Sequence, residues 1–123
     1  SLFHASYAGV SMGLLHGSQP DALVMCHEPT RPHMRGLPEY QLPDIGDCIA
    51  LNEKCAKRVN PAARVVALSV NTAEMADEAE AKAYLDKLSE QYGMPAVDPV
   101  RIGVGPIVEV LEKEWPRSLA HAS

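Results

Sequence analysis

The chain lacks an excess of basic charge, a long apolar run and a regular set of cysteines. Its 11 basic residues are outnumbered by 16 acidic ones, and the formal net charge is −5 at pH 7. Binding along a nucleic-acid backbone requires a concentrated basic surface, so we expect no nucleic-acid partner. No apolar run approaches the roughly 20 residues of a membrane span. We therefore expect no membrane partner and a cytoplasmic location.

The three cysteines occur without the spacing of a disulfide scaffold or a zinc site. There is no Cys-x-x-Cys and no His-Glu-x-x-His sequence, so we predict no dedicated metal site. Cys26 lies in an apolar run, and Cys48 and Cys55 share one face of a predicted helix. We interpret all three as small buried side chains in a reducing compartment.

What the chain does have is the composition of an ordinary globular domain, with 123 residues of which 46% are hydrophobic. Apolar runs predict buried strands at 22–26 and 64–70 and a short edge-like strand at 94–97. Amphipathic patterns predict helices at 7–16, 44–60, 77–92 and 107–115. This alternation predicts an α/β fold, a three-layer sandwich with a mainly parallel sheet.

Several residues define these elements more closely. The run 64–70 is apolar on both faces, which suits a central parallel strand. Asp44 and Gly93 occupy the positions of an N-terminal and a C-terminal helix cap. The helical residues that we expect to face the core are Ile45, Cys48, Ile49, Ala56, Val59, Ala83, Leu85, Leu88 and Tyr92.

The densest group of chemically active side chains is the loop 27–36, which reads His-Glu-Pro-Thr-Arg-Pro-His-Met-Arg-Gly. It directly follows a predicted strand, and ligands bind at the carboxyl ends of strands in open α/β sheets. Its prolines limit how far the loop can fold away. We predict an active or binding site here, with the candidate catalytic residues His27, Glu28 and His33 and the candidate binding residues Thr30, Arg31 and Arg35.

Polar residues also follow the other two predicted strands, and in a parallel sheet all three strand ends lie at one edge. We therefore expect one shared pocket, to which the second and third strand ends add the candidate binding residues Ser69, Asn71, Thr72, Asp98 and Arg101.

Each of these groups also has a purely structural interpretation. His27 and Glu28 can bond to each other to anchor the loop, and Arg31 and Arg35 can pair with acids. Ser69, Asn71 and Thr72 can form a turn that caps the next segment, and Asp98 can pair with Arg101 across Pro99. His4 and Ser6 can either enter the same cleft or act as local caps. The sequence leaves these alternatives open.

Several stretches resemble a bacterial and archaeal family long labelled a domain of unknown function, family 1611. The similar stretches are Ser1–Val10, Leu14–Leu23, Cys26–Pro38, Ser69–Thr72 and Pro95–Gly105. The resemblance implies the second half of a P-loop NTPase-like domain, following a Rossmann-like domain in a larger protein. We thus expect residues 1–123 to form a single α/β domain that is a C-terminal fragment of a two-domain protein.

The resemblance also implies an enzyme, because at least some family members are D-glutamate N-acetyltransferases. The expected reaction transfers acetyl from acetyl-CoA to the amino group of an acidic D-amino acid such as D-glutamate. A base near neutrality must deprotonate the amine, which suits a histidine. Arg31 and Arg35 suit the carboxylates of the amino acid or the phosphates of coenzyme A. The chain has no Gly-Lys-Ser or Gly-Lys-Thr phosphate loop, so we expect it to be inactive alone.

Two alternatives stay open at this point. One is a P-loop nucleotide-dependent enzyme or ligase of the dethiobiotin-synthetase-like type, which uses ATP with magnesium. The other is a non-catalytic binding module whose polar loop meets a partner. The exposed sheet edge of half a domain favours association, so we also expect a homo-oligomer.

Overall fold

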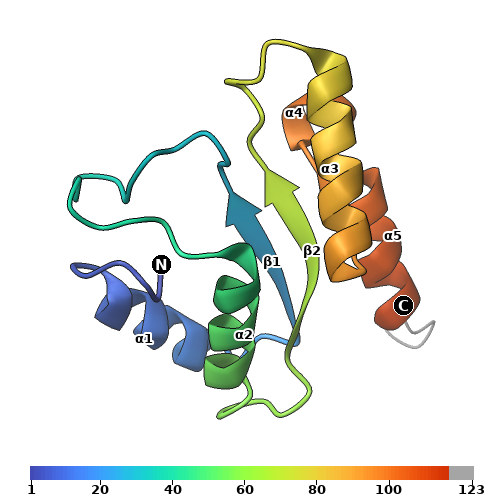
Figure 1. Cartoon of the computed structure of the whole chain (residues 1–123). Helices are drawn as coiled ribbons and strands as arrows, with labels where there is room; N and C mark the ends of the chain where they lie inside the picture. The colour runs from blue at the N-terminus through green and yellow to red at the C-terminus, as the bar shows by residue number, and fades with distance from the viewer. Residues whose placement is uncertain (117–123) are drawn as a thin grey trace.

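The three expected strands form one parallel sheet in the order β1-β2-β3. They are β1 (Ala22–His27), β2 (Arg64–Val70) and β3 (Ala96–Val97). The structure is a computed structural model that describes residues 1–116; residues 117–123 of the expected domain lie outside the described residues. The predicted α/β class with a parallel sheet is confirmed (Figure 1).

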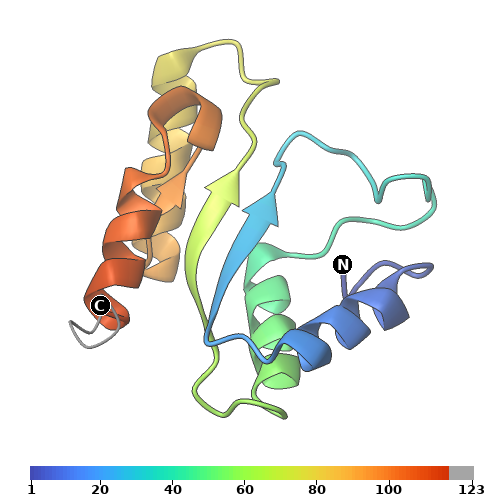
Figure 2. The same ribbon diagram turned by 180° about the vertical axis from the view of Figure 1, so that it is seen from behind.

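Helices cover both faces of this sheet and make the three layers (Figures 1 and 2). The helices are α1 (Ala8–Ser18), α2 (Ile45–Ala56), α3 (Glu78–Tyr92), α4 (Pro99–Ile102) and α5 (Gly105–Glu114). Helices α2 and α3 contribute Ile45, Leu85 and Leu88 to one core cluster with β2. Helix α5 contributes Ile107 to a cluster with Val66 and Val97. None of the helices within residues 1–116 is long and apolar enough to cross a membrane.

The helix boundaries follow the caps that the sequence offers. The Asp44 carboxylate accepts from the Asp47 N–H at 3.2 Å and begins α2. Gly93 ends α3 with a φ of 66°, in the left-handed region that glycine tolerates. Helix α2 ends at Ala56 rather than near Asn60, and the Asn60 side-chain amide donates to the Pro20 carbonyl at 3.0 Å.

The side of α3 that faces the core differs by one residue from the prediction. Ala81, Leu85 and Leu88 are buried, whereas Ala83 is exposed. Positions four and seven apart lie on one face of a helix, and Ala83 is turned about 200° away from Ala81. The prediction for Ala83 was therefore wrong.

Strand β1 is less buried than its apolar sequence predicts. It lies at the edge of the described sheet, with only β2 beside it. Helix α2 packs against the face that carries Met25, whereas Val24 is 38% exposed and Cys26 is exposed. From behind, this second face of β1 lies open to the viewer (Figure 2). The expectation of three buried cysteines is wrong for Cys26, and of the other two only Cys55 is fully buried.

Candidate functional site

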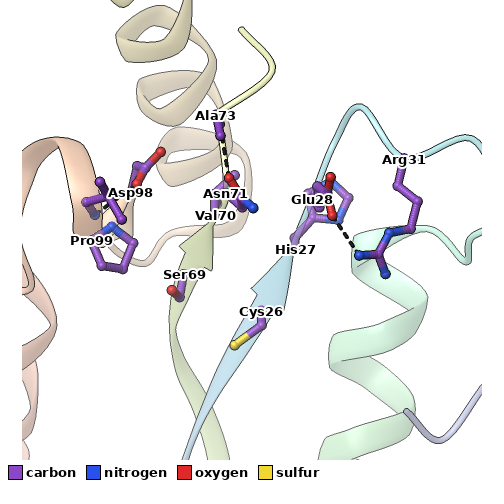
Figure 3. A pocket seen from close by; sticks show the side chains of 11 residues that line it. Cys26, His27, Glu28, Arg31, Ser69, Val70, Asn71, Ala73, Asp98 and Pro99 are labelled. Carbon is purple, nitrogen blue, oxygen red and sulfur yellow. Dashed lines mark hydrogen bonds and ion pairs between the residues drawn. The ribbon is translucent and has the colours of Figure 1, made fainter. Parts of the chain in front are cut away.

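An open cavity of about 590 Å³ lies at the carboxyl ends of the strands (Figure 3). All three strand ends contribute to its wall, as a parallel sheet requires. The lining residues are Cys26, His27, Glu28 and Arg31 after or within β1, Ser69, Val70, Asn71 and Ala73 at β2, and Asp98, Pro99 and Val100 after β3.

The pairing of β1 with β2 brings the first two of these groups together. The last register pair of the two strands is His27 with Val70. One residue further on, the Asn71 N–H donates to the His27 carbonyl at 2.8 Å. The sheet ladder therefore continues to the rim of the cavity and places the side chains of His27 and Asn71 on neighbouring strand ends (Figure 3).

His27 has the electrostatics of a base that is neutral near pH 7. Burial lowers the pKa of its imidazole below the ordinary value of 6.5, and the nearby charge of Glu28 offsets only part of this effect. A neutral imidazole can accept a proton at neutral pH, whereas an imidazolium cannot. The side chain is half-buried against the end of the sheet and still lines the cavity.

Glu28 pairs with Arg31 rather than with His27. An Arg31 guanidinium nitrogen donates to the Glu28 carboxylate at 2.7 Å (Figure 3). Both side chains remain partly exposed, with relative accessibilities of 39% for Arg31 and 28% for Glu28. The pair fixes the guanidinium of this lining residue, and its remaining N–H groups can meet an anion. The predicted structural bond between His27 and Glu28 is absent from the hydrogen bonds of residues 1–116.

Asn71 combines a structural bond with an exposed polar group. Its side-chain oxygen accepts from the Ala73 N–H at 3.0 Å, which is the turn expected as the structural interpretation. The amide nitrogen lies on the side of the cavity that faces His27 (Figure 3). Ser69 lines the same wall from within β2. This part of the site therefore offers hydrogen-bond donors and is not charged.

Thr72 and Asp98, which are buried, form a network with the half-buried Arg101. The Thr72 N–H donates to the Asp98 carboxylate at 3.0 Å, and the Thr72 hydroxyl donates to the same oxygen. Arg101 donates to the carbonyls of Thr72 at 3.1 Å and Met75 at 2.7 Å. The structure therefore favours the structural interpretation of these residues: Asp98 borders the cavity, but Thr72 and Arg101 are not among its lining residues.

Burial alone would raise the pKa of Asp98. Hydrogen bonds from the Thr72 hydroxyl and from the N–H groups of Thr72, Val100 and Arg101 outweigh burial and hold this pKa below the ordinary value of 3.8. The same carboxylate caps α4, a short helix that the sequence analysis did not predict. Asp98 therefore joins the end of β3 to the loop after β2.

The remaining predicted residues leave the loop in other directions. The His33 ring donates to the Met34 carbonyl at 2.8 Å and does not line the cavity. Thr30 is exposed and is also absent from the lining. Arg35 lines a second cavity, of about 480 Å³, next to the start of the chain. The loop bends between these positions because Met34 is buried and its N–H donates to the Tyr40 carbonyl at 2.9 Å.

Three lining residues, Cys26, Val100 and Tyr7, were not predicted from the sequence. Cys26 and Val100 line the first cavity, and Tyr7 lines the second. For Cys26, its position as the penultimate residue of a strand was an available signal; for Tyr7, the sequence contained none. Within the described residues, no three His, Cys, Asp or Glu side chains are placed to hold a metal ion.

Comparison with known proteins decides the family. The family model described as the C-terminal P-loop domain of DUF1611, a domain of unknown function, matches residues 1–108. The chain belongs to the DUF1611 family. A crystal structure of a DUF1611 protein from Anabaena variabilis has the same fold, with a TM-score of 0.82 and 29% identity, over 92% of this chain and 33% of that one.

Two similar proteins bear the name D-glutamate N-acetyltransferase. The protein from Tritonibacter scottomollicae is 50% identical over 111 residues, which are 90% of this chain and 33% of that protein. The protein from a Pseudoalteromonas species is 51% identical over 108 residues, which are 88% of this chain and 32% of that protein. This DUF1611 chain therefore spans about a third of the length of its relatives.

Proposed function

We propose that this DUF1611 chain forms part of an N-acetyltransferase that moves an acetyl group from acetyl-CoA to the amino group of an acidic D-amino acid such as D-glutamate. The observation that carries the proposal is the cavity in which His27, Arg31 and Asn71 meet. It supplies a neutral base, a cation and an amide donor, which are the groups that this reaction requires. The names of the two relatives support acetyl transfer to the nitrogen of D-glutamate.

In the proposed mechanism, His27 takes a proton from the substrate ammonium, and the amine nitrogen then attacks the carbonyl carbon of the thioester. The Asn71 amide donates to the oxygen that becomes negative in the tetrahedral intermediate. The attacking nitrogen, which carries a positive charge after the addition, releases its second proton to water, and the carbon–sulfur bond then breaks. The departing coenzyme A thiolate takes up a proton from the His27 imidazolium, and the base is restored. Arg31 holds a substrate carboxylate.

We further propose that residues 1–123 are one domain at the C-terminal end of a larger, two-domain, homo-oligomeric and cytoplasmic protein. The chain has no Gly-Lys-Ser or Gly-Lys-Thr loop, so in this proposal the donor's phosphates bind to residues that precede it. The chain alone is then inactive. The test measures the release of free thiol from acetyl-CoA by the full-length protein and by the 123-residue chain. The proposal predicts release by the full-length protein only.

The site assignment is tested by His27→Gln in the full-length protein with D-glutamate and acetyl-CoA. Loss of a general base lowers the rate by about 10²- to 10⁴-fold. His33→Gln is the matched comparison, because His33 bonds to the loop backbone and does not line the cavity. Full turnover in His27→Gln, or an equal loss in both variants, contradicts the assignment of His27.

A nucleotide-dependent enzyme or ligase is a second candidate, because the family is described as a P-loop domain. It predicts that the full-length protein binds ATP in the presence of magnesium. Calorimetric titration of that protein with magnesium–ATP and, separately, with acetyl-CoA distinguishes the two functions. Binding of neither compound favours a non-catalytic binding module.

A further inference from the structure

The second cavity lies beside the loop that follows β1. Its volume is about 480 Å³, and its walls come from the start of the chain and from the loop between β1 and α2. Arg31 lines both cavities, so the two are neighbours. The other polar side chains at this second cavity include those of His4, Tyr7 and Arg35.

His4 holds the two walls of this cavity together. Its Nδ1 accepts from the Ser6 N–H at 3.1 Å, so Nε2 carries the ring proton and donates to the Arg35 carbonyl at 3.1 Å. The His4 ring also packs against the Tyr7 ring, with 4.9 Å between the centroids. The position of the Arg35 backbone is therefore set by a residue 31 positions earlier.

The loop on either side of Arg35 is restrained as well. Met34 is buried, and Gly36 has a φ of 75°, which lets the chain turn directly after Arg35. The Arg35 side chain itself forms no ion pair within residues 1–116, in contrast to Arg31, Arg64 and Arg101. A fixed backbone thus presents a guanidinium that has no acidic partner in the described structure.

The charge and shape of the cavity indicate what it binds. Arg31 and Arg35 line it and no acidic side chain does, although the chain as a whole carries a net charge of −5. Met34, Leu42 and Pro43 provide an apolar wall beside the two cations. A short aliphatic chain that ends in a carboxylate matches both features, because a guanidinium binds a carboxylate through two parallel N–H groups.

We propose that this second cavity binds the side-chain carboxylate of the acidic amino acid, and that Arg35 selects for it. This inference rests on the proposed acetyltransferase function. The amino group of the substrate lies beside His27, Arg31 lies between the two ends, and the distal carboxylate meets Arg35. His4 is a positioning residue, since it acts on the substrate only through the Arg35 backbone.

The test compares D-glutamate with D-glutamine, which replaces the distal carboxylate by a neutral amide. In the full-length protein, Arg35→Gln lowers kcat/KM for D-glutamate by about 10- to 100-fold, the usual effect of losing a hydrogen bond to a charged group. The kcat/KM for D-glutamine changes little, so the preference for D-glutamate over D-glutamine is lost. The KM for acetyl-CoA stays the same. Arg35→Lys, which keeps the charge, restores part of the preference.

Arg58→Gln is the matched control. Arg58 is exposed in the turn after α2 and lines neither cavity, so its variant keeps the preference of the parent protein. Two results overturn the inference. One is an unchanged preference for D-glutamate in Arg35→Gln. The other is a rise in the KM for acetyl-CoA alone, which assigns Arg35 to a phosphate of the donor.

Failure of the proposed function is recognised separately, because the parent protein then acetylates neither amino acid. Calorimetric titration with glutarate, a dicarboxylate without an amino group, still decides the inference in that case. Binding to the parent protein and to Arg58→Gln, with at least a tenfold loss in Arg35→Gln, supports the cavity as a carboxylate site. No binding to the parent protein, or equal binding to all three, overturns it.

Discussion

His27 gains its proposed role from its surroundings rather than from its position in the loop motif. Two histidines, His27 and His33, occur within the same loop, and their intrinsic chemistry is identical. His27 is at the end of β1 and lines the cavity, whereas His33 bonds to the neighbouring backbone. Burial lowers the pKa of His27, which favours the form that accepts a proton.

This shift predicts the pH dependence of the proposed reaction. A base must be unprotonated, so kcat/KM falls as the pH falls through the pKa of the free enzyme. Because burial lowers the pKa of His27, the midpoint of this fall lies below pH 6.5. Glu28→Gln removes the charge that raises this pKa, so the acid limb of the profile moves to still lower pH. A profile of kcat/KM between pH 4.5 and 8 measures both effects.

The stability of the fold shifts with pH in the same direction. The unfolded chain binds a proton at His27 near pH 6.5, and the folded chain does so only at lower pH. The contribution of His27 to the free energy of unfolding is therefore present above pH 6.5 and is lost as the pH falls. An acid limb of kcat/KM whose midpoint lies above pH 6.5, or that Glu28→Gln moves to higher pH, contradicts the role of His27 as the base.

The elements around the site are joined by one carboxylate. Asp98 directly follows the short strand β3, caps α4 and accepts two hydrogen bonds from Thr72 in the loop after β2. Strand β3 has only two residues, so the hydrogen bonds of its own ladder are few. The network around Asp98 therefore sets how the third strand end meets the cavity.

This arrangement predicts a large effect of Asp98→Ala on stability. The change leaves buried N–H and hydroxyl groups of Thr72 without a partner, and it lowers the free energy of unfolding by about 2–4 kcal/mol. Urea unfolding measures this loss. Asp86→Ala is the matched control, because its pair with Lys82 is exposed and such pairs contribute about 0–1 kcal/mol. Equal losses in the two variants contradict the role given to Asp98.

Strand β1 is the least covered strand of the domain within residues 1–116. Strand β1 has a neighbour on only one edge, and the face that carries Val24 and Cys26 is uncovered within residues 1–116. The relatives are about three times as long as the matched segment. Both observations agree with the proposal that further elements of a larger protein pack beside β1.

That proposal predicts a difference in thiol reactivity. In the 123-residue chain, a thiol reagent modifies the exposed Cys26 first, before the half-buried Cys48 and the buried Cys55. Burial also raises the pKa of Cys48, which lowers its fraction of reactive thiolate. In the full-length protein, we expect Cys26 to be modified at least tenfold more slowly, as measured by mass spectrometry over time. Equal rates for Cys26 in the two proteins contradict the proposal.

Much of this fold could be predicted from local patterns in the sequence. The two-sided apolar run of β2, the cap at Asp44 and the glycine after α3 each involve residues close together in the chain. The order of strands and helices then required a parallel sheet, whose strand ends meet at one edge. The shared cavity at that edge follows from the same reasoning.

Other features could not be predicted, because they depend on contacts between distant residues. The apolar residues of β1 indicated burial, but exposure depends on what packs beside the strand. Thr72 and Arg101 had the chemistry of binding residues, yet their partners turned them away from the cavity. Arg35 has the same charge as Arg31, yet it lines only the second of the two cavities, where His4 bonds to its carbonyl and the chain turns at Gly36.

The features that could be predicted from the sequence differ from the others in the range of the interactions that set them. Periodicity, caps and turns act over a few residues, so the sequence specifies strands, helices and the polar strand ends directly. Which polar groups bond to one another depends on distances across the chain, such as the 26 positions between Thr72 and Asp98. Those distances are set when the helices and the sheet pack together. Packing alone therefore separated the residues that border the cavities from those that hold the walls in place.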